Sequence, residues 1–282
     1  MKPSLLLTLA AAALAPAAAQ AASLEATTSA GDSAGVVATC LKGSNAADPR
    51  GCTDLIAQSP LVSSATVLSS ASWATYPTSF YSQAAASAAL GTLRAMAQTS
   101  IPLSDAGFHN LQSHAIAEMR DSLIASSSLG TLFNNYQYNV NITGFATPSN
   151  GTYDLPSIKS DTFVQIDIRV ENTGEVLASK HWETSASSLG GGSITGMIGG
   201  VAANTQLALD LYIQSESGIV TSAAGQSGFA EADYSSTVHF YLDALTPGAN
   251  TVSLGGMTMR RRCRSRRVGG WSSSGWWGWG CG

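Results

Sequence analysis

Four histidines are the side chains of this sequence with the widest chemistry, because imidazole transfers protons near neutral pH and binds metals. His109 and His114 are five positions apart, so on a strand they would point to opposite faces of a sheet. His181 and His239 could meet across strands, but no spacing requires it. No nucleophile elbow, zinc-binding helix or phosphate-binding glycine loop accompanies them. We therefore predict no catalytic residues, no cofactor and no metal site.

Two carboxylates on either side of a cleft would indicate a glycoside hydrolase. The candidates that lie close together in the sequence are Asp154, Asp161, Asp167 and Glu171. Hydrophobic alternation, however, places Asp167 and Glu171 on the solvated face of a strand and Asp161 at its start. A secreted hydrolase is therefore the third interpretation of this sequence, and we predict a protein that is not an enzyme.

Aromatic side chains give a second kind of candidate site. Exposed rings on a β-sandwich can stack on pyranose rings while polar neighbours bind the sugar hydroxyls. Trp182, Tyr153 and Tyr234 are the residues that could contact a carbohydrate in this way, and packing in the core is the alternative for Trp182. A carbohydrate-binding β-sandwich module is the corresponding alternative function.

The N-terminal 21 residues predict a secretory signal peptide. Lys2 precedes an apolar run over 5–14, and Ala19-Gln20-Ala21 supplies the small residues that signal peptidase accepts. The run is far shorter than the roughly 20 residues that span a bilayer. We therefore expect a secreted protein of the periplasm, cell surface or extracellular space, with no stable membrane span in the sequence as written.

Cys40 and Cys52 are the two cysteines outside the C-terminal tail. In an oxidising compartment, cysteines at this separation most plausibly form a disulfide that closes a small loop. In the chain-entropy model a loop of this size contributes roughly 3 kcal/mol. No second pair of cysteines or histidines lies nearby at the spacing of a metal site.

The charge of the chain is unevenly distributed. Residues 22–259 contain seven basic residues against all eighteen acidic ones, which gives a net charge of −11. A protein that binds nucleic acid needs clustered lysine and arginine to contact phosphates, so nucleic acid is excluded as a partner. Exopolysaccharide or other surface proteins are the partners that we expect for an acidic extracellular protein.

Alternation with a period of two dominates the second half of the chain. Val164, Ile166, Ile168 and Val170 are separated by polar residues, which predicts a strand with one buried face. A turn at 172–174 and a returning strand over 175–182 complete a hairpin, and the pattern recurs over 207–213 and 238–242. We predict a mainly β fold, an antiparallel β-sandwich or jelly roll, with a helical segment in 80–130 as an alternative.

The predicted organisation has four parts. After the signal peptide (1–21), residues 22–78 form an N-terminal extension with the disulfide loop, and residues 79–256 form the β-sandwich domain. Residues 257–282 form a disordered tail, in which six of the ten arginines fall within 260–267 and four of the six tryptophans within the last twelve residues. Taken as written, this tail would be an interfacial or nucleic-acid-binding arm.

A shifted reading frame gives a second interpretation of the tail. Moving the frame back by one nucleotide turns each tryptophan codon into one that ends in TG, which encodes Leu, Met or Val. The same shift allows Val-Pro-Glu-Pro over Cys263-Arg264-Ser265-Arg266, followed by an apolar run and a basic end. This pattern resembles the PEP-CTERM sorting signal of exported proteins of Gram-negative bacteria. The resemblance implies processing by an exosortase and a non-enzymatic role at the cell surface or in the exopolysaccharide matrix.

Overall fold

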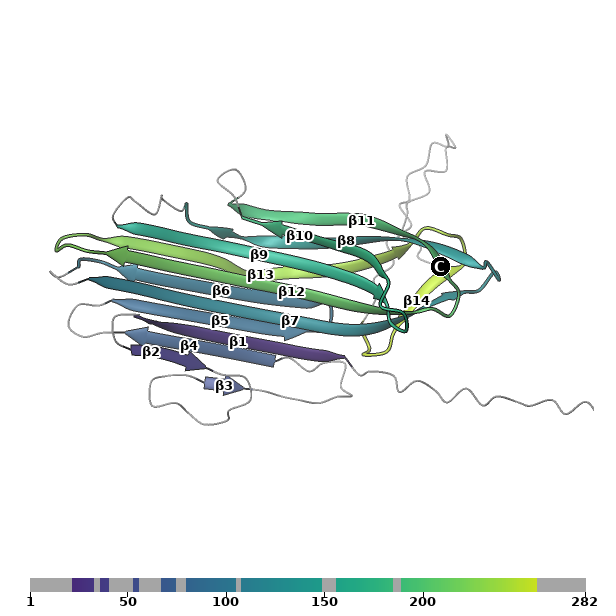
Figure 1. The fold of residues 1–282 in the computed structure, drawn as a ribbon, viewed down its shortest axis with the longest axis horizontal. Helices are drawn as coiled ribbons and strands as arrows, with labels where there is room; N and C mark the ends of the chain where they lie inside the picture. The colour runs from purple at the N-terminus through teal and green to yellow at the C-terminus, as the bar shows by residue number, and fades with distance from the viewer. Residues whose placement is uncertain are drawn as a thin grey trace, which may run out of the picture.

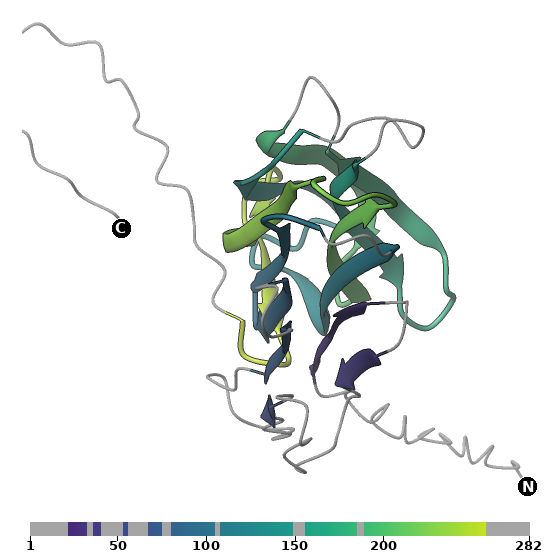
Figure 2. The ribbon, with the colours of Figure 1, turned by 90° about the vertical axis from the view of Figure 1, so that its left-hand side faces the viewer.

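The computed structural model describes residues 22–32, 36–40, 53–55, 67–74, 80–104, 108–148, 156–184 and 189–257. All regular elements in these ranges are strands, and they form two antiparallel sheets that pack face to face (Figures 1 and 2). The predicted mainly β sandwich is therefore confirmed. The predicted signal peptide lies outside the described residues, as do the sorting signal, Tyr153, Asp154 and Cys52. The predicted disulfide therefore also falls outside them, although the backbone of Cys40 ends a strand.

Sheet 1 has seven strands, and its spatial order begins at an edge hairpin. The order is β10 (Val176–Glu183), β9 (Ser157–Val170), β12 (Gln206–Thr221), β7 (His109–Ser127), β1 (Ser23–Asp32) and β2 (Val36–Cys40). The seventh strand, β14 (Ala249–Ser253), pairs with the end of β7 beyond β1. The long strands β7, β9 and β12 therefore form the centre of the sheet (Figure 1).

Sheet 2 also has seven strands, and it covers the inner face of sheet 1. Its order is β11 (Gly190–Ala202), β8 (Phe133–Ala146), β13 (Gly228–Ala244), β6 (Thr92–Ile101), β5 (Tyr81–Ala89), β4 (Val67–Ala74) and β3 (Thr53–Leu55). The view along the strands shows the two layers end on (Figure 2). Each sheet thus keeps one face in the core and turns the other outward.

The predicted hairpin is the edge of sheet 1. β9 pairs with β10 from Val176 opposite Arg169 to Glu183 opposite Phe163, with one irregularity near the turn. Gly174 has a φ of 70° in that turn, which glycine adopts without the strain of a side chain. The inward residues Val164, Ile166 and Ile168 are completely buried, as the alternation predicted, whereas Val170 at the end of the strand is half-buried.

The helical alternative for 80–130 is wrong, because this segment contains β5, β6 and the whole of β7. Alanine and serine alternate there with larger or polar residues, and the small side chains point into the space between the sheets. Ala84, Ala95 and Ala115 are examples of these buried positions. Alanine favours a helix in isolation, but a narrow gap between two sheets also requires small residues, and here tertiary packing overrides the intrinsic propensity.

Two pairs of hydroxyl groups in the core meet across strands. Ser113 and Ser217 are 2.8 Å apart between their Oγ atoms, and Thr162 Oγ1 lies 2.9 Å from Ser215 Oγ. Burying a hydroxyl without a partner costs free energy, so these pairs allow a core that contains serine and threonine as well as alanine.

Both ends of the described domain differ from the sequence-based boundaries. β1 pairs with β7 over ten residues and β4 pairs with β5, so the described parts of the predicted extension belong to the sheets of the sandwich. At the other end Met257 is 7% exposed, with its side chain against Gly91. The packed chain therefore reaches residue 257. Within the described residues, no helix has the length and hydropathy that would cross a membrane.

Candidate functional site

Two of the three predicted carbohydrate contacts meet inside the sandwich. The rings of Trp182, on β10, and Tyr234, on β13, lie 5.7 Å apart in an edge-to-face arrangement. Tyr234 is completely buried, its hydroxyl donates to the carbonyl of Leu189, and burial raises its pKa to about 12. Trp182 is half-buried and stands over Gly192. The pair joins the two sheets, and the structure thus gives Trp182 the core-packing role.

The four histidines are separated in the fold. His109 packs edge-on against Phe80 inside the sandwich, whereas His114 lies on the outer face of the same strand. His181 and His239 belong to different sheets, on β10 and β13. Within the described ranges, no group of three or more histidine, cysteine, aspartate or glutamate side chains is arranged to hold a metal ion.

The carboxylates of β9 point away from sheet 2. Asp161 and Asp167 are on the outer face with Lys159, Phe163, Gln165 and Arg169, while the even-numbered residues between them point inward. Asp167 is nevertheless only 8% exposed, because Arg169 Nη2 lies 3.2 Å and Gln165 Nε2 2.9 Å from its Oδ2. The prediction of a solvated strand face is thus right in direction, but the neighbours cover this carboxylate.

The outward side chains of β7, β12 and β9 together form the candidate site, which we call the polar face. The register aligns them in rows: Tyr212 is opposite Glu118 on β7 and Gln165 on β9, and Glu216 is opposite His114 and Asp161. Directly opposed residues of an antiparallel sheet have Cβ atoms about 5 Å apart, so each row is a contiguous surface. No single segment of the sequence contains this arrangement.

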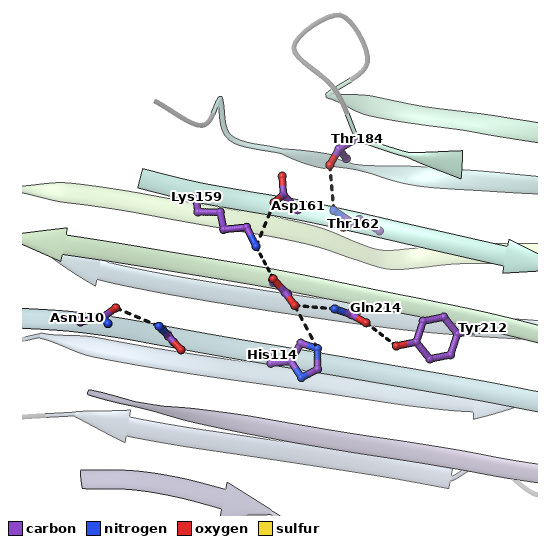
Figure 3. A network of polar contacts seen from close by, with 10 residues as sticks. Asn110, His114, Lys159, Asp161, Thr162, Thr184, Tyr212 and Gln214 are labelled. Atoms are coloured by element: carbon purple, nitrogen blue, oxygen red, sulfur yellow. Dashed lines mark hydrogen bonds and ion pairs between the residues drawn. The ribbon is translucent and has the colours of Figure 1, made fainter. Parts of the chain in front are cut away.

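One end of the polar face is a network that contains Lys159, His114 and Gln214 (Figure 3), and Glu216 is its centre. It accepts hydrogen bonds of 2.6 Å from Lys159 Nζ and from Gln214 Nε2, and His114 Nε2 is 3.5 Å away. Burial alone would raise the pKa of Glu216, but Lys159 outweighs it through its hydrogen bond and charge, and the pKa is held below its ordinary value. Burial lowers the pKa of His114 despite the attraction of Glu216. At neutral pH the cluster thus contains an ionised carboxylate, a charged lysine and a neutral imidazole.

The other end of the polar face is an open hollow of about 650 Å³. Its charged lining includes Arg120, which contacts Glu118 Oε1 at 2.7 Å and Asp210 Oδ1 at 3.3 Å, and the Arg169 and Asp167 pair. The hydrogen bond and charge of Glu118 raise the pKa of Arg120, which stays protonated. Guanidinium and carboxylate groups thus lie side by side in a hollow that a polar molecule could enter.

Three aromatic rings connect the two ends of the polar face. Phe163 stacks on His181 with centroids 5.5 Å apart and an interplanar angle of 23°, and it meets Tyr212 edge-on at 6.3 Å. The hydroxyl of Tyr212 donates to Gln214 Oε1 at 2.5 Å. Sequence reasoning missed this cluster. The available signal was that Phe163 and Tyr212 occupy outward positions of alternating strands, where the neighbouring outward residues are polar.

Comparisons with known proteins give no relative to guide the interpretation. No protein-family model matches this chain, and no curated protein is significantly similar to it. The chemistry of the polar face is therefore interpreted from its own residues.

Proposed function

We propose that this protein is an exported, non-enzymatic component of the cell surface or extracellular matrix whose polar face binds an uncharged polysaccharide. The observation that carries the proposal is the aromatic cluster of Phe163, His181 and Tyr212 between two groups of hydrogen-bonding side chains. An outward aromatic ring on a soluble sheet adds apolar surface where solubility alone would favour a polar residue.

The two kinds of side chain match the two kinds of surface on a sugar. A pyranose ring has a face of C–H groups that packs on an aromatic ring, and hydroxyl groups at its rim that need donors and acceptors. Gln214 and Glu216 adjoin Tyr212 on one side, and Asp210 and Arg120 adjoin it on the other. A polysaccharide that runs along the strands would meet both sets.

The charge of the polar face selects against acidic polysaccharides. Its described carboxylates are Glu118, Asp161, Asp167, Asp210 and Glu216, and its cations are Arg120, Lys159 and Arg169. Each cation already has a carboxylate partner, so a uronate chain would meet a net negative surface. An uncharged glycan would pay no such repulsion.

The export route is the part of the proposal that depends on the termini. The signal sequence over 1–21 supports secretion, and the tail over 257–282 supports sorting of the PEP-CTERM type in the shifted frame. Sequencing the genomic DNA across codons 255–282 tests this directly. A frame that encodes Val-Pro-Glu-Pro would support the sorting signal, whereas confirmation of the written frame without that motif would refute it.

Glycan binding is tested by affinity electrophoresis of the full chain in gels that contain hydroxyethylcellulose, dextran or galactomannan, with alginate as the acidic comparison. We expect at least one uncharged polymer to retard the protein and alginate to leave its mobility unchanged. Tyr212→Ala and Phe163→Ala should weaken retardation strongly, whereas Tyr212→Phe should keep it because the ring remains. Trp182→Ala should lower the stability of the protein, but the protein that remains folded should bind polysaccharide as the wild type does.

Several results would contradict the proposal. The polar face is not a polysaccharide site if none of the three uncharged polymers retards the wild-type chain. The same conclusion follows if Tyr212→Ala binds like the wild type with an unchanged melting temperature. Stronger retardation by alginate than by the uncharged polymers would refute the charge argument.

A further inference from the structure

The outer face of sheet 2 carries a row of side-chain amides. Gln137, Asn139 and Asn141 occupy successive outward positions of β8, while Tyr138 and Val140 between them are buried. Positions two apart on a strand are separated by about 6.8 Å, so neighbouring amides of one strand do not bond to each other directly. We call this row of three residues the amide strip.

The strands on both sides of the amide strip continue its chemistry. On β11 the opposing residues are Ser193, Thr195 and Met197, and on β13 they are His239, Tyr241 and Asp243. The rows at Asn139 and Asn141 therefore combine hydroxyl, amide and aromatic side chains across three strands, while Gln137 lies between Met197 and Asp243. The rings of His239 and Tyr241 are 6.2 Å apart and tilted by 42°, so the strip has an aromatic border.

Ordinary requirements of the fold do not explain the amide strip. Asparagine is depleted in strands because its side chain competes for backbone hydrogen bonds. Asn135, the next outward residue of β8, has a structural task, since its Oδ1 accepts a hydrogen bond from the backbone of Gly200 at 3.1 Å. Asn139 is different, because its Oδ1 is shielded from solvent and has no hydrogen-bond partner among the described groups. Burying an acceptor without a hydrogen bond costs free energy. A sugar hydroxyl bound along the strip would donate to Asn139 Oδ1 after a small rotation of the asparagine side chain, and would so recover that free energy.

Charge distinguishes the amide strip from the polar face of sheet 1. Of the nine residues in its three rows, Asp243 is the one that carries a formal charge at neutral pH. Amides both donate and accept hydrogen bonds, as sugar hydroxyls do, and they need no counterion. Among possible ligands, an uncharged, hydroxyl-rich chain fits this surface best.

We propose that the amide strip with Tyr241 is a second binding surface for an uncharged polysaccharide, on the opposite side of the sandwich from the polar face. This inference rests on the proposed function, because the two surfaces would bind the same class of polymer. They lie on the outer faces of different sheets, so the core separates them and one glycan chain lying on either face would leave the other free (Figure 2). A single copy of the protein would then join two polysaccharide chains and act as a cross-link in the matrix.

The test separates binding from bridging. Latex beads coated with hydroxyethylcellulose, dextran or galactomannan are mixed with the full chain, and agglutination is recorded together with the amount of protein bound. The variants are Asn139→Ala with Tyr241→Ala for the amide strip, and Phe163→Ala with Tyr212→Ala for the polar face. Gln83→Ala is the matched control, because it removes an amide from the outer face of sheet 2 on β5, outside the strip. Light scattering shows whether each protein is a monomer.

We expect the wild type and Gln83→Ala to agglutinate beads as monomers. Each double variant should still bind beads, with an affinity lowered about tenfold or more, but should no longer agglutinate them. The combined quadruple variant should not bind.

Other results overturn the inference in distinguishable ways. Agglutination by the amide-strip variant at the wild-type level refutes the second site and leaves the proposed function standing. Loss of all binding in the amide-strip variant, with no effect of the polar-face variant, refutes the proposed function and the bridging together. A dimeric wild type that the amide-strip variant converts to a monomer identifies the strip as a contact between protein copies instead.

Discussion

Glycine 192 gives the sharpest test of how the two sheets fit together. A Cβ atom at this position would overlap Nε1 of Trp182 and lie 2.9 Å from its Cε2, closer than real Cβ atoms approach. Gly192→Ala should therefore push the indole away from Gly192 and from its edge-to-face partner Tyr234. Gly190 is the matched control on the same strand, because a Cβ there would have no atom within 4 Å.

The expected magnitudes follow from overpacking and chain entropy. Forcing an extra methyl group into a packed site costs typically about 1–3 kcal/mol. Replacing glycine with alanine returns about 0.4–1 kcal/mol by restricting the unfolded chain. We therefore expect Gly192→Ala to lower the free energy of unfolding by roughly 1–2 kcal/mol, and Gly190→Ala to leave it unchanged or raise it slightly. At about 2–4 °C per kcal/mol for a domain of this size, the melting temperatures should separate clearly.

Urea denaturation followed by far-UV circular dichroism measures these differences without depending on tryptophan fluorescence. A double-mutant cycle with Trp182→Ala isolates the contact, because Gly192→Ala should cost little once the indole is gone. Equal stability of the Gly190→Ala and Gly192→Ala proteins would refute the packing of Trp182 against β11. An undiminished cost of Gly192→Ala in the Trp182→Ala background would show that the strain lies elsewhere.

Three further outcomes are expected from the fold. In the same urea assay, Ile166→Asp should destabilise the protein by several kcal/mol because it buries an unpaired charge. Gln165→Ala should destabilise it by less than about 1 kcal/mol. Equal losses would refute the assignment of inward and outward side chains on β9. Burial raises the pKa of Asp121, although Ser253, Gly255 and Ser122 donate hydrogen bonds to its carboxyl group. The stabilisation from Asp121 is therefore complete below its unfolded pKa near 3.8 and is lost as the pH rises through its folded pKa. The stability of Asp121→Asn relative to the wild type should accordingly increase with pH, and a flat or falling difference would refute this. Deleting residues 258–282 should leave the melting temperature unchanged. Deleting from residue 255 onward should lower the melting temperature, because the buried Met257 is then lost. Equal melting temperatures for the two truncations would contradict the role of Met257.

The disulfide remains a prediction from the sequence alone. Cys40 and Cys52 should be bonded in protein isolated from an oxidising compartment, since the proposed export would expose both thiols to oxidation. Mass spectrometry after alkylation under non-reducing conditions measures this, and two alkylated thiols would show that the bond does not form.

The sequence predicted those strands in which large aliphatic residues alternate with polar ones. β9 and β12 belong to this class, because branched and bulky side chains at every second position fit one buried sheet face and no helix face. β5 and β6 remained ambiguous, since alanine supports a helix, and what makes them strands is the second sheet packed at close range. β1 escaped prediction for a similar reason, as its buried residues Ala26, Thr28 and Ala30 are small.

The candidate site could be predicted only in part. Periodicity correctly placed Asp167 on an outer face, because the direction of a side chain depends on position within its own strand. It put Asp161 at the start of that strand, whereas β9 begins at Ser157. It could not show that Tyr212 lies opposite Gln165, since that pairing joins positions far apart in the sequence and depends on long-range register. The meeting of Trp182 and Tyr234 was hidden for the same reason, because the two residues belong to different sheets.

The alternation of inward and outward side chains along each strand separates the residues that stabilise this fold from those available for binding. On β12, Leu211 and Ile213 point inward and are completely buried, while Tyr212 between them points outward toward Phe163. Changing an inward residue removes buried apolar surface from the core, whereas changing an outward ring removes contacts that involve one face alone. Outer faces can therefore diverge in chemistry without altering the sandwich, which explains how one sheet carries charged pairs around aromatic rings and the other a row of amides. The corresponding measurement is the pair Ile213→Ala and Tyr212→Ala. The first should lower the free energy of unfolding by about 2–5 kcal/mol and the second should mainly weaken glycan retardation, and the reverse pattern would mean that the polar face exists for stability alone.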